Sequence, residues 1–143
     1  MADTKFDLIV IGSGPGGYVT AIRGAQLGLR VAIVEDKHLG GICLNWGCIP
    51  TKALLRSAEI YHYATHAQNY GLKIDKVEID FAAIIKRSRD VAKRLSGGVA
   101  MLLKKHKVTI VEGRGQLAGQ GAVAVTHQGK AVGTYHGAHI ILA

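Results

Sequence analysis

The apolar positions near the N-terminus predict a strand, a helix and a second strand in close succession. Phe6–Ile11 is a short, continuous apolar run of the kind found in buried strands. Tyr18–Leu27 carries small residues along one side and reads as a helix that Gly28 ends, a common helix-stop position. Arg30–Glu35 is apolar between its charged ends and predicts the second strand.

Two further helices and a strand are expected in the middle of the chain. Ala53–Ala67 reads as a helix, and Phe81–Lys105 reads as a long one in which Gly97-Gly98 is a candidate kink. We expect the basic residues of the long helix to form a solvated face. Val108–Val111 then predicts a strand that returns to the sheet. The apolar face of the long helix is predicted to comprise Phe81, Ile84, Ile85, Val91, Leu95, Val99, Leu102 and Leu103.

From Gln116 onward, short apolar runs lie between glycine-bearing turns, and this pattern predicts an antiparallel meander. The runs are Val123–Val125, Ala131–Val132 and Thr134–Tyr135. A final apolar strand is expected over Ala138–Ala143. The chain should therefore combine a parallel sheet near its start with antiparallel strands near its end.

The link between the first strand and the first helix is Gly12-Ser13-Gly14-Pro15-Gly16-Gly17, which fits G-x-G-x-x-G. Gly12 permits a tight turn, Gly14 lets a pyrophosphate approach the backbone, and Gly17 allows close helix–sheet packing. The N-terminus of the helix attracts the phosphates. Glu35 lies 18 residues after Gly17 and can accept hydrogen bonds from ribose hydroxyls. The whole pattern predicts an α/β protein with a Rossmann-type parallel sheet and a dinucleotide site, without separating FAD from NAD.

Cys43 and Cys48 are the only cysteines, and a bond between them requires an irregular backbone. A disulfide needs Cα atoms within roughly 7 Å, whereas positions five apart on a regular helix rise about 7.5 Å along the axis. Gly47 tolerates such backbone, and a short, accessible disulfide of this kind is typically labile.

Inert core thiols, half of a zinc site and a secretory disulfide are the alternative interpretations of the two cysteines. The C-x4-C spacing lacks a second pair, and no signal-peptide pattern precedes the cysteines. The neighbouring nucleotide pattern disfavours all three.

Composition limits the remaining classes of function. The 143 residues suit a single core, and no apolar run is long enough to span a membrane, so we expect a cytoplasmic domain with no membrane partner. The net charge of +8 suggests nucleic-acid binding as one interpretation. The basic residues are dispersed, however, and no recognition motif accompanies them, which disfavours it. Attraction of anionic FAD or of an acidic partner domain is a sufficient role for that charge. His62 and His66 lie four apart without a cysteine or carboxylate cluster, so we expect no metal site.

The segment around the cysteines reads GGICLNWGCIPTK and resembles the redox-active disulfide motif of the pyridine nucleotide–disulfide oxidoreductases. These flavoproteins include dihydrolipoyl dehydrogenase, glutathione reductase and mercuric reductase. The Leu-Asn-Trp-Gly interior and the Ile-Pro-Thr-Lys-Ala-Leu-Leu continuation are most similar to dihydrolipoyl dehydrogenases, whereas glutathione reductases tend to carry Val-Asn-Val-Gly and Val-Pro-Lys-Lys. The resemblance extends from Phe6 to Ala143 and implies FAD as the cofactor.

The resemblance implies different roles for the two thiols. Cys43 matches the interchange thiol that exchanges with a dithiol substrate, and we expect it to be the more accessible of the two. Cys48 matches the thiol that contacts the flavin, and Lys52 matches a lysine near the flavin ring. If a helix begins near Cys48, Pro50 falls in its first turn, where proline is tolerated, and the helix end favours a thiolate. Lys52 then lies one turn further on the same face.

The resemblance also implies the contacts to the rest of FAD. Gly12, Gly14 and Gly17 match the turn that holds the pyrophosphate. Glu35 matches the ligand of the adenosine ribose. Gly115 matches a backbone contact to the adenosine part.

Members of this family are much longer than 143 residues. We therefore expect residues 1–143 to be an N-terminal FAD-binding domain, truncated before the NAD-binding and dimerisation domains, and inactive in isolation. The implied parent is a homodimer that oxidises dihydrolipoamide on lipoyl domains of 2-oxoacid dehydrogenase or glycine cleavage complexes. Electrons would pass through Cys43–Cys48 and FAD to NAD⁺. The alternatives are a non-catalytic FAD-binding fragment or a related disulfide reductase of the glutathione or mercuric type.

Overall fold

The computed structural model describes residues 4–143, which form six strands and four α-helices. In chain order the elements are β1 (Lys5–Ile11), α1 (Pro15–Gln26), β2 (Val31–Glu35), α2 (Gly41–Asn45), α3 (Cys48–Thr65), the 3-10 helix η1 (Ala67–Tyr70), α4 (Phe81–Lys105), β3 (Thr109–Glu112), β4 (Arg114–Leu117), β5 (Ala122–His127) and β6 (Lys130–Leu142).

The strands form one mixed sheet in the order β3-β2-β1-β6-β5-β4. β1 pairs in parallel with β2 on one side and with the second half of β6 on the other, and β2 pairs in parallel with β3. β4, β5 and the first half of β6 pair antiparallel. The predicted α/β fold, with a Rossmann-type parallel sheet and an antiparallel meander, is confirmed.

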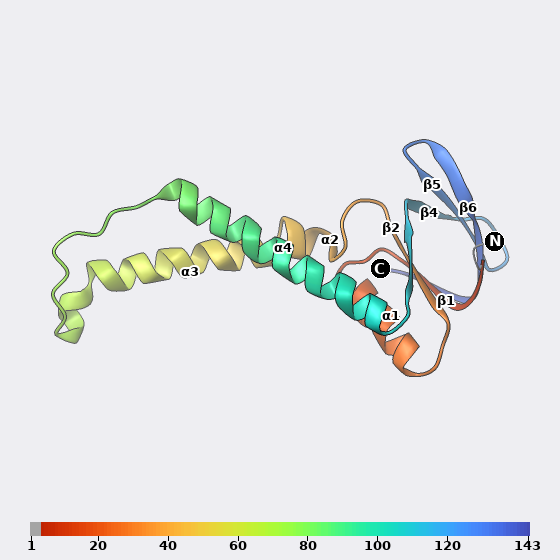
Figure 1. The fold of residues 1–143 in the computed structure, drawn as a ribbon, viewed down its shortest axis with the longest axis horizontal. Coiled ribbons are helices and arrows are strands. Elements are labelled where there is room, and N and C mark those ends of the chain that lie inside the picture. Colours follow the sequence, from red (N-terminus) through yellow and green to blue (C-terminus); the bar gives the residue numbers. More distant parts are fainter. Residues whose placement is uncertain (1–3) are drawn as a thin grey trace.

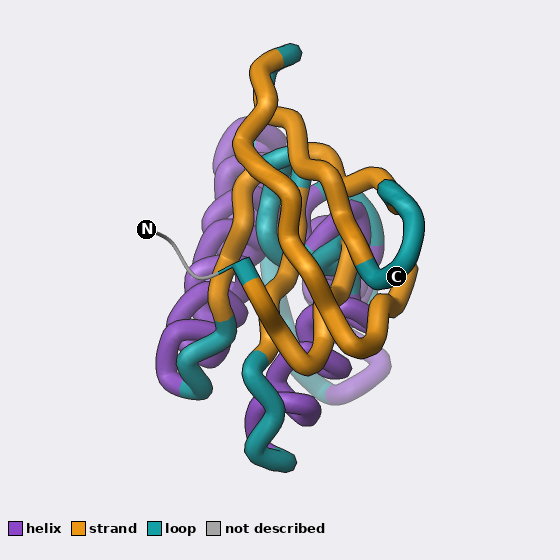
Figure 2. The backbone as a smooth tube through the Cα atoms, turned by 90° about the vertical axis from the view of Figure 1, so that its right-hand side faces the viewer, coloured by secondary structure: helices purple, strands orange, loops and turns teal. Residues whose placement is uncertain are grey.

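Alternate residues of β1 and β2 face two different cores, as the period of two along a strand requires. Leu8, Val10 and Ile33 face α1 and the end of α4, where Ala21, Val99 and Leu103 cover them. Ile9 and Val34 face the other way, into a core with Val111, Val123 and Val125. Figure 2 shows the strands in front and the helices behind, so the parallel sheet lies between helices and antiparallel strands.

α3 and α4 lie side by side and project from the sheet (Figure 1). We call α3, the connecting residues 66–80 and residues 81–93 of α4 the helical arm. The carboxylate of Asp80 accepts a hydrogen bond from the Ala83 amide at 2.9 Å and so caps α4, whose predicted bounds are confirmed. The helix continues through Gly97-Gly98.

The predicted apolar face of α4 is only partly buried. Val99 and Leu103 belong to the core, whereas Phe81, Leu95 and Leu102 are exposed. The side chains that α4 buries nearer its start are the small residues Ser88 and Ala92. Helical periodicity therefore predicted the buried face only at Val99 and Leu103, in the last turns of α4 that reach the sheet.

The predicted division of the C-terminal segment into several short strands is wrong, because β6 is continuous from Lys130 to Leu142. Gly133 and Gly137 lie inside this strand rather than in turns. A Cβ at Gly137 would lie 2.9 Å from a side-chain carbon of Ile9 and from the His139 carbonyl oxygen. Gly137 therefore permits a close approach where β6 passes from its antiparallel partner to its parallel partner.

Candidate dinucleotide and disulfide site

The glycine turn joins β1 to α1 through backbone contacts that exclude side chains. Gly12 has a φ of +98°, and its amide donates to the Val34 carbonyl at 2.8 Å. A Cβ at Gly12 would collide with the carbonyl of Ala143, and one at Gly17 would collide with the carbonyl of Gly12. The roles predicted for the tight turn and for close packing therefore have a direct steric basis.

Gly14 differs from these two glycines because the space beside it is open. It is the N-cap of α1, it has an extended backbone (φ −61°, ψ −178°), and a Cβ there would meet nothing within 4 Å. Gly16 and Gly17 lie in the first turn of the helix, where backbone N–H groups have no carbonyl partner within the helix. An open glycine beside a helix N-terminus suits a diphosphate, so the turn fits the pyrophosphate of FAD.

Glu35 ends β2 beside this turn, and its carboxylate is held by backbone and side-chain donors. The Ser13 amide donates to one carboxylate oxygen at 3.0 Å, and the Ser13 hydroxyl donates to the same oxygen. The Lys37 amide donates to the other oxygen at 2.8 Å. Partial burial raises the pKa of Glu35, but the hydrogen bonds from Ser13, Lys37 and His38 outweigh it, so the net pKa is lowered. Glu35 is therefore held ionised at neutral pH.

Gly115 on β4 lies over the ends of β1 and β2. A Cβ there would approach side-chain carbons of Ile11 and Val34 at 3.2 Å. The neighbouring Gly113 donates its amide to the Glu35 carbonyl at 2.8 Å. The structure thus brings the segment that contains Gly115 next to Glu35, although 80 residues separate the two in the sequence.

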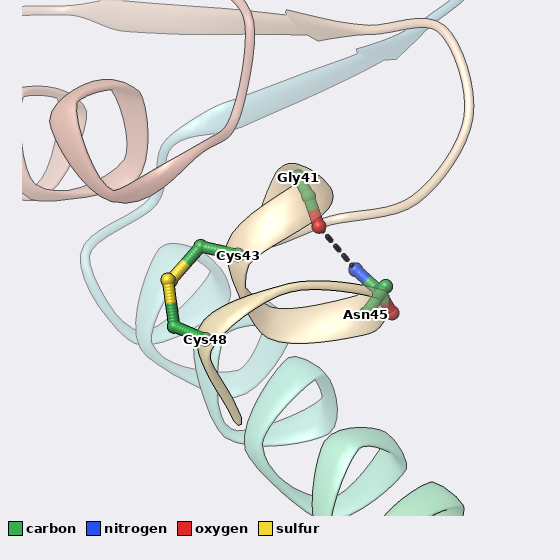
Figure 3. The surroundings of a disulfide bond; sticks show 4 residues. All are labelled: Gly41, Cys43, Asn45 and Cys48. Carbon is green, nitrogen blue, oxygen red and sulfur yellow. Dashed lines mark hydrogen bonds between the residues drawn. A yellow bond between two sulfur atoms is a disulfide. The ribbon is translucent and has the colours of Figure 1, made fainter. Parts of the chain in front are cut away.

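Cys43 and Cys48 form a disulfide, with Cα atoms 4.7 Å apart (Figure 3). The bend that brings them together lies between α2 and α3, as the geometric argument from the sequence required. The Asn45 side-chain amide donates to the carbonyls of Leu39 at 3.0 Å and Gly41 at 2.9 Å. These bonds link the end of the short α2 to its start. Gly47 follows, and a Cβ there would crowd the Cys43 Cα at 3.3 Å.

α4 fixes the bend between α2 and α3 through two hydrogen bonds to Asn45. Arg89 donates to the Asn45 carbonyl at 3.0 Å, and the Ser96 hydroxyl donates to the Asn45 side-chain oxygen at 3.1 Å. The Leu44 side chain is buried in the core between α2 and the sheet. The disulfide segment is thus anchored by α4 and by the core, and Figure 3 shows the sulfur bridge on the side of the bend opposite Asn45.

α3 spans Cys48–Thr65, so it begins five residues before the predicted helix Ala53–Ala67 and meets the condition of a helix start near Cys48, with Pro50 in its first turn. Lys52 is exposed one turn further along the same helix. Cys48 is exposed and Cys43 is half-buried, so for the protein atoms alone the expected order of access is reversed. A group seated against Cys48 would cover it and leave Cys43 as the thiol open to a substrate.

Ser13, Gly40 and Gly41 were not predicted as site residues, although all three lie in the quoted motifs. Ser13 is completely buried and bonds to Glu35. Gly40 and Gly41 have φ values of +90° and +60°, and a Cβ at Gly41 would lie 2.8 Å from the Gly14 Cα. The signal was the glycine pair just before Cys43, which is typical of a close backbone approach.

The rings of His62 and His66 have centroids 4.2 Å apart on the exposed side of α3. In the part of the chain that the structure describes, no three His, Cys, Asp or Glu side chains are placed to hold a metal ion. No helix within residues 4–143 has both the length and the apolar character to cross a membrane.

The fold and the disulfide beside the glycine turn agree with the comparison to known families. Residues 6–143 match the pyridine nucleotide-disulphide oxidoreductase model, and the chain belongs to that family. Within the family, it is similar to proteins named dihydrolipoyl dehydrogenase. The protein from Zymomonas mobilis is 64% identical over 119 residues, which cover 83% of this chain and 25% of that relative.

Two further relatives extend the similarity over nearly the whole chain. The dihydrolipoyl dehydrogenase from Rhizobium etli is 50% identical, covering 97% of this chain and 32% of the relative. The mitochondrial dihydrolipoyl dehydrogenase 1 from Arabidopsis thaliana is 44% identical, covering 96% of this chain and 27% of the relative. The chain thus spans about a quarter to a third of the length of the curated relatives it matches.

Proposed function

We propose that residues 1–143 are the FAD-binding and redox-disulfide domain of a dihydrolipoyl dehydrogenase. The observation that carries the proposal is the direct contact between the glycine turn and the disulfide segment, through Gly14 and Gly41. A dinucleotide on the turn would lie beside the start of α2, and Cys43 is the third residue of that helix. The proposed cofactor site therefore adjoins the segment that carries the disulfide.

The chain's own residues divide into two groups in this reaction. Gly12, Gly14 and Gly17 bind the diphosphate, and the ionised Glu35 accepts hydrogen bonds from the adenosine ribose. Gly115 supplies backbone beside the adenosine.

Cys43, Cys48 and Lys52 carry the chemistry on the other side of α2. A dihydrolipoamide thiolate attacks the sulfur of Cys43 and releases Cys48 as a thiolate, which the N-terminus of α3 stabilises. The second substrate thiol then displaces Cys43, so lipoamide leaves oxidised and the protein keeps two reduced cysteines. The chemistry that FAD would supply when bound is a two-electron acceptor for the reduced cysteines, with NAD⁺ as the final acceptor. Lys52 follows Cys48 by one turn of α3, which supports a role for its positive charge near the flavin.

The wider assignment follows from the same relatives. We propose a homodimeric parent that binds NAD and serves lipoyl domains of 2-oxoacid dehydrogenase or glycine cleavage complexes. We also propose a cytoplasmic location, where a disulfide between the only two cysteines is better suited to catalysis than to structure. The charge of +8 suits an acidic partner domain.

The nucleotide site is tested by adding a side chain at Gly14. Since a Cβ there meets no protein atom, Gly14→Val should keep the fold but block the diphosphate. We expect FAD affinity to fall by at least about 100-fold, measured by quenching of flavin fluorescence, as one blocked diphosphate contact removes several hydrogen bonds. Circular dichroism should show an unchanged fold.

Gly97→Val is the matched control, because a Cβ at Gly97 also meets nothing within 4 Å but lies on α4. It should bind FAD like the unmodified chain. Equal FAD binding by the Gly14→Val variant and the unmodified chain would refute the site. Failure of dihydrolipoamide to bleach bound flavin would refute the disulfide's role while leaving the nucleotide site intact.

A further inference from the structure

Ser13 is the residue at which the glycine turn, the end of β2 and the start of α2 meet. Its side chain is completely buried. Its amide and hydroxyl both donate to one oxygen of Glu35. In return, the Gly40 amide donates to the Ser13 hydroxyl at 3.2 Å and to the Ser13 carbonyl at 3.1 Å. One residue thus ties together segments that lie 22 and 27 positions away.

The segments that connect Ser13 to the disulfide are closely packed against one another. Next to Ser13, the Gly14 Cα packs against Gly41, where a Cβ would lie only 2.8 Å away. A Cβ at Gly40 would lie 2.8 Å from the Leu44 Cβ. α2 starts at Gly41 and reaches Cys43 two residues later. Close-packed groups of this kind transmit displacement rather than absorb it.

The only other buried polar side chain among residues 4–143 has a purely local role. Ser88 is as buried as Ser13, but its hydroxyl donates to the Ile85 carbonyl at 2.7 Å within α4. A buried hydroxyl needs only one such local partner to be satisfied. The bonds that Ser13 makes across three segments exceed this requirement, which indicates a role in fixing their relative positions.

We propose that Ser13 is a positioning residue for the Cys43–Cys48 disulfide, and that a diphosphate ligand on the glycine turn slows reduction of this disulfide through Ser13 and Gly40. The ligand half of the proposal rests on the nucleotide site proposed above. Reduction requires an attacking thiolate to line up with the sulfur–sulfur bond, and one of the two sulfurs belongs to the half-buried Cys43 on α2, so the mobility of α2 affects the rate. A ligand that orders the turn and Glu35 would make α2 less mobile and hinder that alignment.

The first experiment needs no ligand. Dithiothreitol reduces the disulfide: each cysteine gains one hydrogen, and dithiothreitol loses both of its thiol hydrogens as it closes its own disulfide. Ser13→Ala should speed this reaction about three- to tenfold, the factor that corresponds to losing one buried hydrogen bond. Amide hydrogen exchange at Gly40 and Gly41 should also quicken. Ser88→Ala, which makes the same chemical change at equal burial, should alter neither rate.

The second experiment adds ADP, which carries the adenosine diphosphate part of the cofactor but no flavin that could react. Saturating ADP should slow disulfide reduction in the unmodified chain about three- to tenfold and should have no such effect in Ser13→Ala. If Ser13→Ala does not fold, slower exchange at Gly40 and Gly41 when ADP binds the unmodified chain decides the matter.

Three results would overturn the proposal, and they separate it from the proposed function. Equal reduction rates in Ser13→Ala and Ser88→Ala would refute the positioning role. ADP that binds by calorimetry yet leaves the reduction rate unchanged would refute only the ligand effect. Absence of ADP binding would refute the nucleotide site and the ligand effect together, while the ligand-free rates would still decide the role of Ser13.

Discussion

The candidate site is filled by close backbone contacts, whereas the helical arm exposes large apolar side chains. At the site, backbone meets backbone: Gly12, Gly17 and Gly41 have no room for a side chain, and each polar group of Ser13 has a partner. On the arm, large apolar side chains face outward, with Phe81 and Tyr70 each 68% exposed and Leu55 62% exposed. Two apolar grooves of about 640 and 330 Å³ lie on the arm and none of their lining residues belongs to the site.

This difference shows that cavity size does not locate the chemistry in this chain. The largest hollows follow from the exposed arm, where α3 and α4 have left the sheet. The site is identified instead by glycines at which a Cβ would collide with backbone, by the buried Ser13 and by the hydrogen-bonded carboxylate of Glu35. Adding a side chain at Gly12 or Gly17 should therefore be costly for stability, whereas substitutions on the arm should be mild.

The largest effect is expected at Gly17. A Cβ there would collide with the Gly12 carbonyl, so Gly17→Val should lower the free energy of unfolding by more than about 4 kcal/mol or abolish folding. Thermal unfolding by circular dichroism measures the change. Gly97→Val, on the open side of α4, should cost less than about 1 kcal/mol, and equal losses in the two variants would remove the contrast.

Leucine-to-alanine substitutions give a second, smaller contrast. Leu103 is completely buried against the sheet, so Leu103→Ala should cost about 2–5 kcal/mol in the free energy of unfolding. Leu55 on the arm is exposed, and Leu55→Ala should cost less than about 1 kcal/mol. Urea denaturation distinguishes the two. A cost at Leu55 equal to that at Leu103 would mean that the arm is buried in solution.

The smallest effect concerns the acid dependence of stability. The folded-state pKa of Glu35 lies below its ordinary value of 4.5, so its carboxylate stabilises the fold above pH 4.5 and loses this contribution as the pH falls through the folded pKa. Glu35→Gln should cost about 1 kcal/mol at neutral pH, the net contribution of a hydrogen bond. The cost should shrink in more acidic solution. A cost that grows with acidity would contradict the assigned direction.

Local patterns in the sequence predicted most of the parallel part of the fold. The runs Phe6–Ile11 and Arg30–Glu35 became β1 and β2, and Phe81–Lys105 became α4 with both ends correct. β6 was divided wrongly because glycine in a strand has the same sequence signal as glycine in a turn. Only the neighbour Ile9, 128 positions before Gly137, explains why a glycine stands there.

The candidate site was also predicted in its parts but not in its connections. The motifs identified the glycines, Glu35 and the cysteines individually. The bonds from Ser13 to Glu35 and Gly40, and the contact between Gly14 and Gly41, depend on how the three segments pack. Such contacts join positions far apart in the sequence, and no local pattern specifies them.

The central claim is that the disulfide lies against the flavin through Cys48, and single cysteine substitutions test it most directly. In the FAD-loaded protein, Cys43→Ser leaves Cys48 as a free thiol that the N-terminus of α3 favours as a thiolate. We expect this variant to show a long-wavelength thiolate–flavin absorption, and Cys48→Ser to lack it. The opposite pattern would exchange the roles of the two cysteines, and no band in either variant would contradict the claim by placing the disulfide away from the flavin.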